Sequence, residues 1–238
     1  EKFINDSWQS SLMSYFNQIE NTAVHASLAY ATSPMMADIL AIQKIYGASQ
    51  VTSGATVWGA NTTLRGYADT LFGAVIERQG SKHIDGNAVA YTIYDRSGYD
   101  TLNLSPSSSA NRIDIRPEAF SDIQGGRGNL GIARGTIIEK VIGGGGNDTI
   151  TGNSAANDLQ GGQGNDHLLG ERGDDRLYGG DGNDTLFGGN GDDRIDGAAG
   201  NDILRGSSGA DTIYGGSGYD RFDFSHVISA TSIDLAAN

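Results

Sequence analysis

The chain has 238 residues, which is enough for one elongated domain or two small ones. It contains 36 glycines, 3 prolines and no cysteine, which excludes collagen, a disulfide framework and a thiolate zinc site, and argues against a proline-rich linker. The formal net charge of −13 argues against nucleic-acid binding, because that function needs a basic patch. No apolar run is long enough to predict a transmembrane helix.

Residues 1–47 are expected to form the mainly helical end of a larger domain. A helix is predicted to begin at Pro34, with Ser33 as its N-cap and Gly47 as its stop signal. Between them, apolar residues recur at spacings of three and four, which gives the helix one apolar face. Such a face needs a partner surface, and 47 residues supply little core for it.

Residues 48–142 are predicted to be a β-strand region that leads into the repeats. The segments 89–95, 100–105, 112–116 and 135–143 are rich in β-branched residues, and they often alternate between apolar and polar side chains. Residues 224–238 are expected to form a C-terminal strand and tail.

Residues 143–223 consist of nine tandem nonapeptides whose period does not slip. Glycine prevails at positions one, two and four of the unit, and an apolar residue always occupies position eight. The position-six residues are Asp148, Asn157, Asp166, Asp175, Asp184, Asp193, Asp202, Asp211 and Asp220. The pattern is typical of the calcium-binding nonapeptide GGxGxDxUx, which forms a parallel β-roll. The predicted fold class is therefore all-β, with a calcium-bound parallel β-roll.

Each nonapeptide is predicted to be a turn followed by a short strand, so that two nonapeptides complete one coil. The turns of repeats i and i+2 then stack about 4.8 Å apart, and their carboxylates repel one another. Calcium bound between two aspartates and several carbonyl groups would relieve this repulsion. One edge carries five position-six aspartates and the other carries four position-six residues, which predicts up to seven sites. Asn157 offers an uncharged oxygen, so the site that it shares is expected to be weaker.

Calcium is expected to be necessary for the roll to fold. The repeats hold 15 acidic residues against 5 arginines, a net charge of −10, and only one core residue per nonapeptide. So thin a core does not offset the cost of ordering the backbone without the free energy of metal binding. We expect the roll to be disordered at the low calcium concentration inside a bacterium and to fold after export.

The repeats resemble those of the repeats-in-toxin (RTX) class, which secreted toxins, proteases, lipases, epimerases and adhesins share. Further segments, in the same order along the chain, resemble the serralysins, which are secreted bacterial zinc endopeptidases of the metzincin group. These segments are SLMSY (11–15), SPMMADILAIQKIYGA (33–48), TVWG (56–59), YDRSGYDTLNLS (94–105), FSDIQGGRGNLGIARG (120–135) and IEKVIGGGGND (138–148). The resemblance implies that residues 1–47 are the end of a metzincin catalytic domain.

The resemblance also implies roles for two N-terminal residues. Met13 matches the methionine of the Met-turn, a structural residue that forms an apolar floor beneath the zinc. Tyr15 matches the tyrosine that approaches the zinc and stabilises the oxyanion during peptide hydrolysis. Plain core packing is the alternative for both residues.

Further calcium sites between the N-terminal segment and the repeats follow from the same resemblance. Carbonyl groups near Thr52, Gly54 and Thr56, together with Asp95 and Asp100, match one such site. A neighbouring site matches Asp100 and Glu139. At a position where the family commonly has a further aspartate, this chain has Asn103.

The zinc-binding sequence HExxHxxGxxH of a metzincin does not occur in the chain. The four histidines are His25, His83, His167 and His226; none is followed by glutamate, and we interpret each as a surface residue. We therefore expect a C-terminal fragment that is inactive alone and that binds zinc only together with an N-terminal catalytic segment. That segment could be present as a separate chain.

Two functions remain open from the sequence. The first is the C-terminal portion of a serralysin-like zinc metalloendopeptidase that acts on protein substrates. Its roll would support folding, stability and type I export to the extracellular medium. The second is a non-catalytic RTX module that serves as a calcium-dependent structural or interaction domain. Another RTX enzyme fits poorly, because no G-x-S-x-G nucleophile motif is present.

Overall fold

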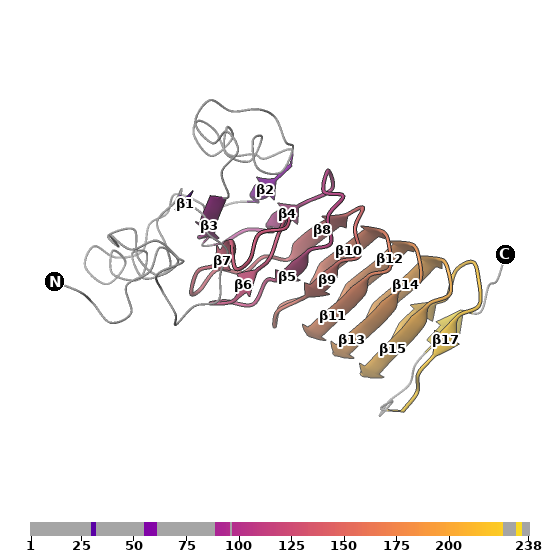
Figure 1. Ribbon diagram of the computed structural model, residues 1–238. Helices are drawn as coiled ribbons and strands as arrows, with labels where there is room; N and C mark the ends of the chain where they lie inside the picture. The colour runs from indigo at the N-terminus through magenta and orange to yellow at the C-terminus, as the bar shows by residue number, and fades with distance from the viewer. Residues whose placement is uncertain (1–29, 32–54, 61–88, 96, 226–231, 235–238) are drawn as a thin grey trace.

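The computed structural model describes residues 30–31, 55–60, 89–95, 97–225 and 232–234 (Figure 1). Within these ranges every regular element is a β-strand, and no helix occurs. Several predictions fall outside the described residues: the helix after Ser33, and the roles or surface positions of Met13, Tyr15, His25, Thr52, Gly54, His83 and His226.

The described residues form eighteen strands, most of them three to six residues long. In chain order they are β1 (Tyr30–Ala31), β2 (Val57–Gly59), β3 (Val89–Ile93), β4 (Thr101–Asn103), β5 (Arg112–Asp114), β6 (Phe120–Ser121), β7 (Leu130–Ile132), β8 (Lys140–Gly144), β9 (Thr149–Thr151), β10 (Asp158–Gln163), β11 (His167–Arg172), β12 (Arg176–Asp181), β13 (Thr185–Asn190), β14 (Arg194–Ala199), β15 (Ile203–Ser208), β16 (Thr212–Tyr214), β17 (Arg221–Phe222) and β18 (Ser232–Asp234).

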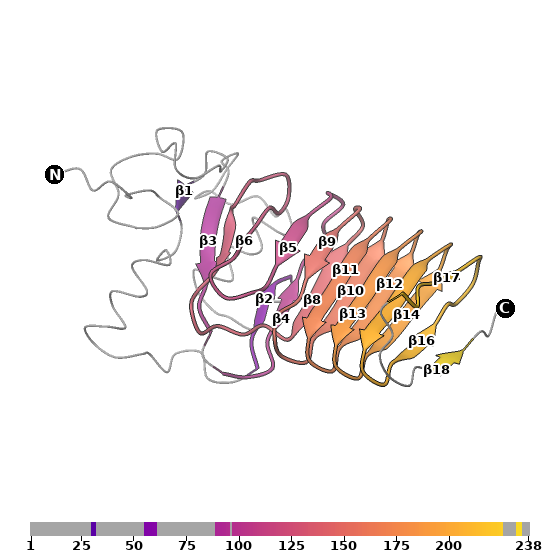
Figure 2. The ribbon, with the colours of Figure 1, turned by 90° about the horizontal axis from the view of Figure 1, so that it is seen from below.

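Two parallel sheets build a roll, and from β8 to β18 successive strands alternate between them (Figures 1 and 2). The eight-stranded sheet has the order β18-β16-β14-β12-β10-β8-β4-β2, and the six-stranded sheet has the order β17-β15-β13-β11-β9-β5. Paired residues in the repeats lie 18 positions apart, as in Leu159 opposite Leu177. Two nonapeptides therefore make one coil, which confirms the predicted all-β parallel roll.

The core of the roll is a double row of position-eight side chains, one row from each sheet. Eight of the nine are 0–2% exposed, and Phe222 at the C-terminal end is partly buried against them. The eight are Ile150, Leu159, Leu168, Leu177, Leu186, Ile195, Leu204 and Ile213. Because side chains alternate along a strand, positions seven and nine face outward. The prediction of one core residue per nonapeptide is confirmed.

The roll extends upstream of the repeats. In the eight-stranded sheet Trp58 pairs with Leu102, which pairs with Val141, and Val141 pairs with Leu159 of the second repeat. In the six-stranded sheet Ile113 pairs with Ile150. A coil therefore needs an inward apolar residue and a pairing strand, and it can form without the glycine motif.

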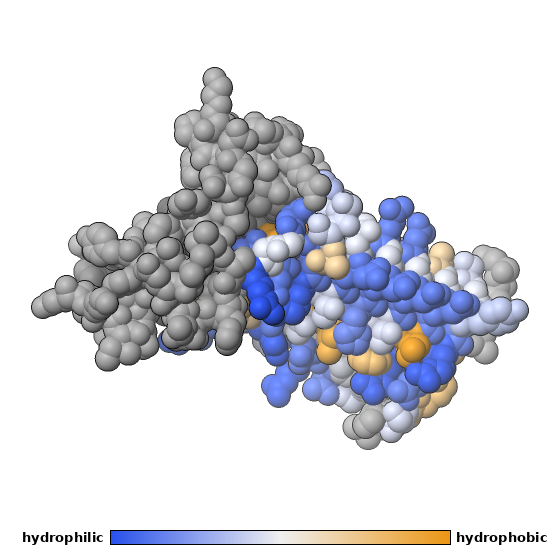
Figure 3. Space-filling view, in the orientation of Figure 1, coloured by the Kyte–Doolittle hydropathy of each residue, from blue (hydrophilic) through white to orange (hydrophobic). Residues whose placement is uncertain are grey.

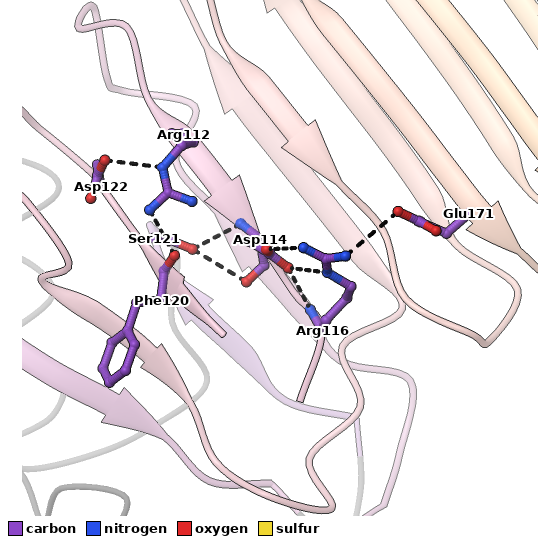
Figure 4. A network of polar contacts seen from close by, with 7 residues as sticks. All are labelled: Arg112, Asp114, Arg116, Phe120, Ser121, Asp122 and Glu171. Atoms are coloured by element: carbon purple, nitrogen blue, oxygen red, sulfur yellow. Dashed lines mark hydrogen bonds and ion pairs between the residues drawn. The ribbon is translucent and has the colours of Figure 1, made fainter. Parts of the chain in front are cut away.

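A four-stranded sheet of order β1-β3-β7-β6, in which β6 and β7 are antiparallel, lies beside this upstream end. Figure 4 shows the polar network that covers the edge strand β5. The backbones of Arg112 and Asp122 exchange two hydrogen bonds, and their side chains form an ion pair of 3.0 Å. Arg116 donates hydrogen bonds to both carboxylate oxygens of Asp114, at 2.9 and 2.7 Å. The guanidinium of Arg116 also lies 3.7 Å from the carboxylate of Glu171 in β11. Covering β5 removes an exposed edge to which another strand could pair.

The described surface is mostly hydrophilic, and apolar residues form only scattered spots on the face in Figure 3. His167 lies on the outer face of β11, half-buried, with its ring edge-on to that of Phe187 at 5.4 Å between centroids. The interpretation of His167 as a surface residue is thus confirmed. Among the described residues, no helix has the length and apolar character needed to cross a membrane.

Candidate calcium-binding edges

The position-six side chains line the two edges of the roll where its turns stack. From Asp148 to Asp211 they are 1–3% exposed, although all but Asn157 are carboxylates. Asp220 at the C-terminal end is only partly buried. Buried carboxylates are rare in proteins unless they are paired with a charge or bind a metal.

One oxygen of each inner carboxylate is used by a ladder that runs along the edge. On the first edge the backbone N–H of Asp148 donates to Oδ1 of Asp166 at 2.7 Å, and that of Asp166 donates to Oδ1 of Asp184 at 2.8 Å. The second edge repeats this arrangement from the N–H of Asn157 to Asp175 at 2.7 Å and onward through Asp193 to Asp211. The predicted stacking of repeats i and i+2 is confirmed.

The second oxygen, Oδ2, has no hydrogen-bond partner in seven of these carboxylates, although each is buried. The seven are Asp148, Asp166, Asp175, Asp184, Asp193, Asp202 and Asp211. A buried polar atom without a partner lowers the stability of the fold by about 1–3 kcal/mol, and by more when it is charged. Seven such oxygens at equivalent positions of the repeats therefore need an explanation.

The surroundings of these oxygens fit a hard cation. A Cβ atom built on Gly161 would meet both Oδ2 of Asp166 and the carbonyl oxygen of Gly179, and Gly143 faces Asp148 and the Gly161 carbonyl in the same way. Glycine at position one therefore leaves room in which a carboxylate oxygen and a carbonyl oxygen of the next coil converge. Calcium prefers six to eight oxygens of these two kinds.

Burial raises the pKa values of the same carboxylates. The pKa rises to about 7 for Asp166, Asp175 and Asp193, and to about 6 for Asp148 and Asp202. Desolvation is the largest cause in each case, and it outweighs the backbone hydrogen bond that each carboxylate accepts. A bound cation would favour the ionised forms.

The upstream acidic residues also come together. Oδ1 of Asp100 accepts the N–H of Thr56 at 2.6 Å, and the N–H of Asp100 donates to Oε2 of Glu139 at 2.7 Å. Oδ2 of Asp95 accepts Nε1 of Trp58 at 3.3 Å. Desolvation raises the pKa of Asp100 to about 6, with the charges of Asp95 and Glu139 adding to it, and desolvation also raises the pKa of Glu139. Thr56, Asp95, Asp100 and Glu139 are thus neighbours.

Within the described residues no three His, Cys, Asp or Glu side chains group in a way that could hold a metal ion. Metal ligands at these edges would therefore have to include backbone carbonyls. Asn103, which stands where the family commonly has a further aspartate, stabilises a local turn, because its Oδ1 accepts the N–H of Ser105 at 3.0 Å.

A second ladder, at position five, was not predicted from the sequence. The N–H of Asn165 donates to Oδ1 of Asn147, and the N–H of Asn183 donates to Oδ1 of Asn165, at 2.9 and 2.8 Å. On the other edge Asp174 and Asp192 accept in the same way. The recurrence of Asn or Asp at position five is a signal that could have revealed this ladder.

The sequence of the chain is similar to those of known proteins. Residues 60–236 match the family described as Peptidase M10 serralysin C terminal. Serralysin B of Dickeya chrysanthemi is 42% identical over 141 residues, which is 59% of this chain and 27% of that protein. A serralysin of Photorhabdus sp. (strain Az29) is 38% identical over the same shares, and metalloprotease AprA of Pseudomonas entomophila (strain L48) is 37% identical over 133 residues, 54% of this chain and 25% of that protein. The chain thus spans about a quarter of the length of these relatives.

Proposed function

Because the chain belongs to the serralysin C-terminal family of peptidase M10, we propose that it is the C-terminal portion of a secreted zinc metalloendopeptidase. Its roll would bind calcium along both edges and thereby support the folding, stability and export of the enzyme. The observation that carries this proposal is the set of seven buried Oδ2 atoms without partners, four on one edge and three on the other, each beside a position-one glycine.

The side chains that would hold calcium within the repeats are the position-six aspartates, with backbone carbonyls of the stacked turns. Bound calcium would supply positive charge to edges whose repeats carry a net charge of −10. Because the carboxylates come together only in the coiled chain, metal binding and folding are coupled. Low calcium would leave the chain unfolded for type I export, and millimolar calcium outside the cell would fold it.

Two neighbouring sites are proposed upstream of the repeats. In the first, Asp95 and Asp100 would supply carboxylates, and the carbonyl groups near Thr52, Gly54 and Thr56 would complete the ligand set. In the second, Asp100 and Glu139 would supply the carboxylates. The mutual proximity of Asp100, Thr56 and Glu139 supports this proposal.

The proteolytic role would depend on residues 1–47 and on a catalytic segment that carries HExxHxxGxxH. Met13 would form the apolar floor of the zinc site, and Tyr15 would donate a hydrogen bond to the oxyanion of a protein substrate. Zinc would supply the activated water for hydrolysis in the joined molecule. The chain alone is proposed to be inactive.

A calcium titration followed by far-UV circular dichroism tests the roll, with magnesium at the same concentrations as the control. We expect β signal to appear with calcium and not with magnesium, because magnesium requires a smaller, more rigid octahedral site. A spectrum that does not respond to calcium would refute the calcium-binding roll.

Casein hydrolysis and zinc content, measured on the same sample, test the proteolytic role. We expect neither from the chain alone, and both after addition of an N-terminal segment from a serralysin that carries HExxHxxGxxH. Calcium-dependent folding without any gain on addition of that segment would favour the non-catalytic module instead.

A further inference from the structure

We call two position-six residues that stack one coil apart a rung. On the second edge, the rung formed by Asn157 and Asp175 differs from all the others. At Asn157 the oxygen that lies beside the position-one Gly152 and the Gly170 carbonyl is Oδ1. This is the place that Oδ2 takes in the aspartate repeats, where it has no hydrogen-bond partner. In contrast, Oδ1 of Asn157 accepts the backbone N–H of Asn153 at 2.8 Å.

The backbone at position two explains how this N–H reaches the oxygen. In the other eight repeats the position-two residue has a positive φ, between 73° and 151°, and at Asn153 it does not. The eight residues are Gly144, Gly162, Glu171, Gly180, Gly189, Ala198, Ser207 and Gly216. The altered turn at Asn153 presents a hydrogen-bond donor where the other repeats leave a carboxylate oxygen open.

The amide nitrogens complete the arrangement. Nδ2 of Asn153 donates to the carbonyl oxygen of Ile138 at 2.8 Å, and Nδ2 of Asn157 donates to the same oxygen at 3.3 Å. Both side chains are buried, with 4% and 3% exposure. Exchanging O and N of the Asn157 amide would place donor against donor at Asn153 and acceptor against acceptor at Ile138, so the network determines its orientation.

We propose that the rung between Asn157 and Asp175 binds no calcium, and that the Asn153–Asn157 pair joins it to the upstream coil in place of the ion. An N–H that donates to the only side-chain oxygen of Asn157 occupies the direction from which a cation would approach, and its partial positive charge repels the cation. The pair also uses the Ile138 carbonyl. This inference rests on the proposed calcium binding of the other rungs, and it revises the weaker site that the sequence predicts for Asn157.

The test counts bound calcium by native mass spectrometry on the full chain at saturating calcium. Asn157→Ala should leave the count unchanged, whereas Asp184→Ala should lower it by one or two, because Asp184 takes part in two rungs. The triple variant Asn153→Gly, Ala155→Gly, Asn157→Asp restores the glycines at positions two and four and the carboxylate at position six, so it should raise the count by one. It also decides the question if Asn157→Ala does not fold.

Loss of one ion in Asn157→Ala, or an unchanged count in the triple variant, would overturn the inference while leaving calcium binding by the roll intact. An unchanged count in Asp184→Ala would instead refute the proposed calcium rows themselves. The two failures are therefore distinguishable.

Discussion

The backbone N–H of Asp166 donates a hydrogen bond to Oδ1 of Asp184 across 2.8 Å, which links two turns one coil apart. The same carboxylate keeps its other oxygen, Oδ2, buried and without a partner. Each of the seven buried position-six aspartates thus has two separate tasks: one oxygen joins the coils by a protein hydrogen bond, and the other is available to a cation.

This division of tasks predicts the effect of Asp184→Asn. The amide can keep the Oδ1 contact, but it replaces Oδ2 and its charge with an NH₂ group that cannot bind calcium. At calcium concentrations a hundredfold above the dissociation constant, loss of one ion should lower the free energy of unfolding by about 2.7 kcal/mol. Thermal unfolding of the variant and the parent chain in saturating calcium measures this loss of stability.

Asp181→Asn is the matched control for that variant, because Asp181 lies in the same repeat, is exposed and occupies position three. It removes the same charge and should change the stability by less than about 0.5 kcal/mol. Equal losses in the two variants would contradict a specific role for position six.

The thin core predicts a large cost for Leu168→Ala. Leu168 is fully buried in the row of position-eight residues, and truncation of such a leucine costs about 2–5 kcal/mol. Its neighbour Leu169 lies at position nine on the outer face and is only partly buried, so Leu169→Ala should cost clearly less. Denaturant unfolding in saturating calcium compares the stabilities of the two variants. A larger loss in Leu169→Ala than in Leu168→Ala would argue against the inward assignment of position eight.

Backbone conformation at position two predicts a stabilising substitution. Ala198 has a φ of 73°, a region that is unfavourable for residues with a Cβ atom, whereas most repeats have glycine there. Ala198→Gly should therefore raise the free energy of unfolding by up to about 1 kcal/mol. Ala199→Gly, at a position without a positive φ, should lower it by about 0.5–1 kcal/mol, because glycine gains more entropy on unfolding. Destabilisation by both would contradict this interpretation.

The raised pKa values predict an unusual pH dependence for the metal-free roll. The carboxyls of Asp166, Asp175 and Asp193 have pKa values of about 7 when buried, against an ordinary value of 3.8 for a solvated aspartate. The folded state therefore holds protons that the unfolded state releases. Their contribution to stability is fully present below about pH 4 and is lost as the pH rises through about 7.

In a chelator, the β signal in circular dichroism should therefore be stronger near pH 5 than at pH 8. In saturating calcium the β signal should instead be stronger at pH 8 than at pH 5, because calcium competes with protons for the same oxygens. Greater order at pH 8 than at pH 5 in the chelator would contradict the burial of neutral carboxyls.

The nine-residue period by itself determined the repeated part of the fold. A glycine turn followed by a short strand with one inward residue can return the chain only as a two-strand coil. Position eight therefore had to form the core, and position six had to stack along the edges. The residue at position 157 was also visible from the sequence as the one asparagine among position-six aspartates.

Only the tertiary structure decided the features that depend on contacts between unlike segments. The pairing of Leu102 with Val141 brings together residues 39 apart, a separation that loops set and no period predicts. The contact of Asn157 with the Ile138 carbonyl likewise needs the upstream coil in place. A periodic sequence predicts contacts between equivalent positions, whereas the direction of each side-chain hydrogen bond depends on the backbone that packs against it.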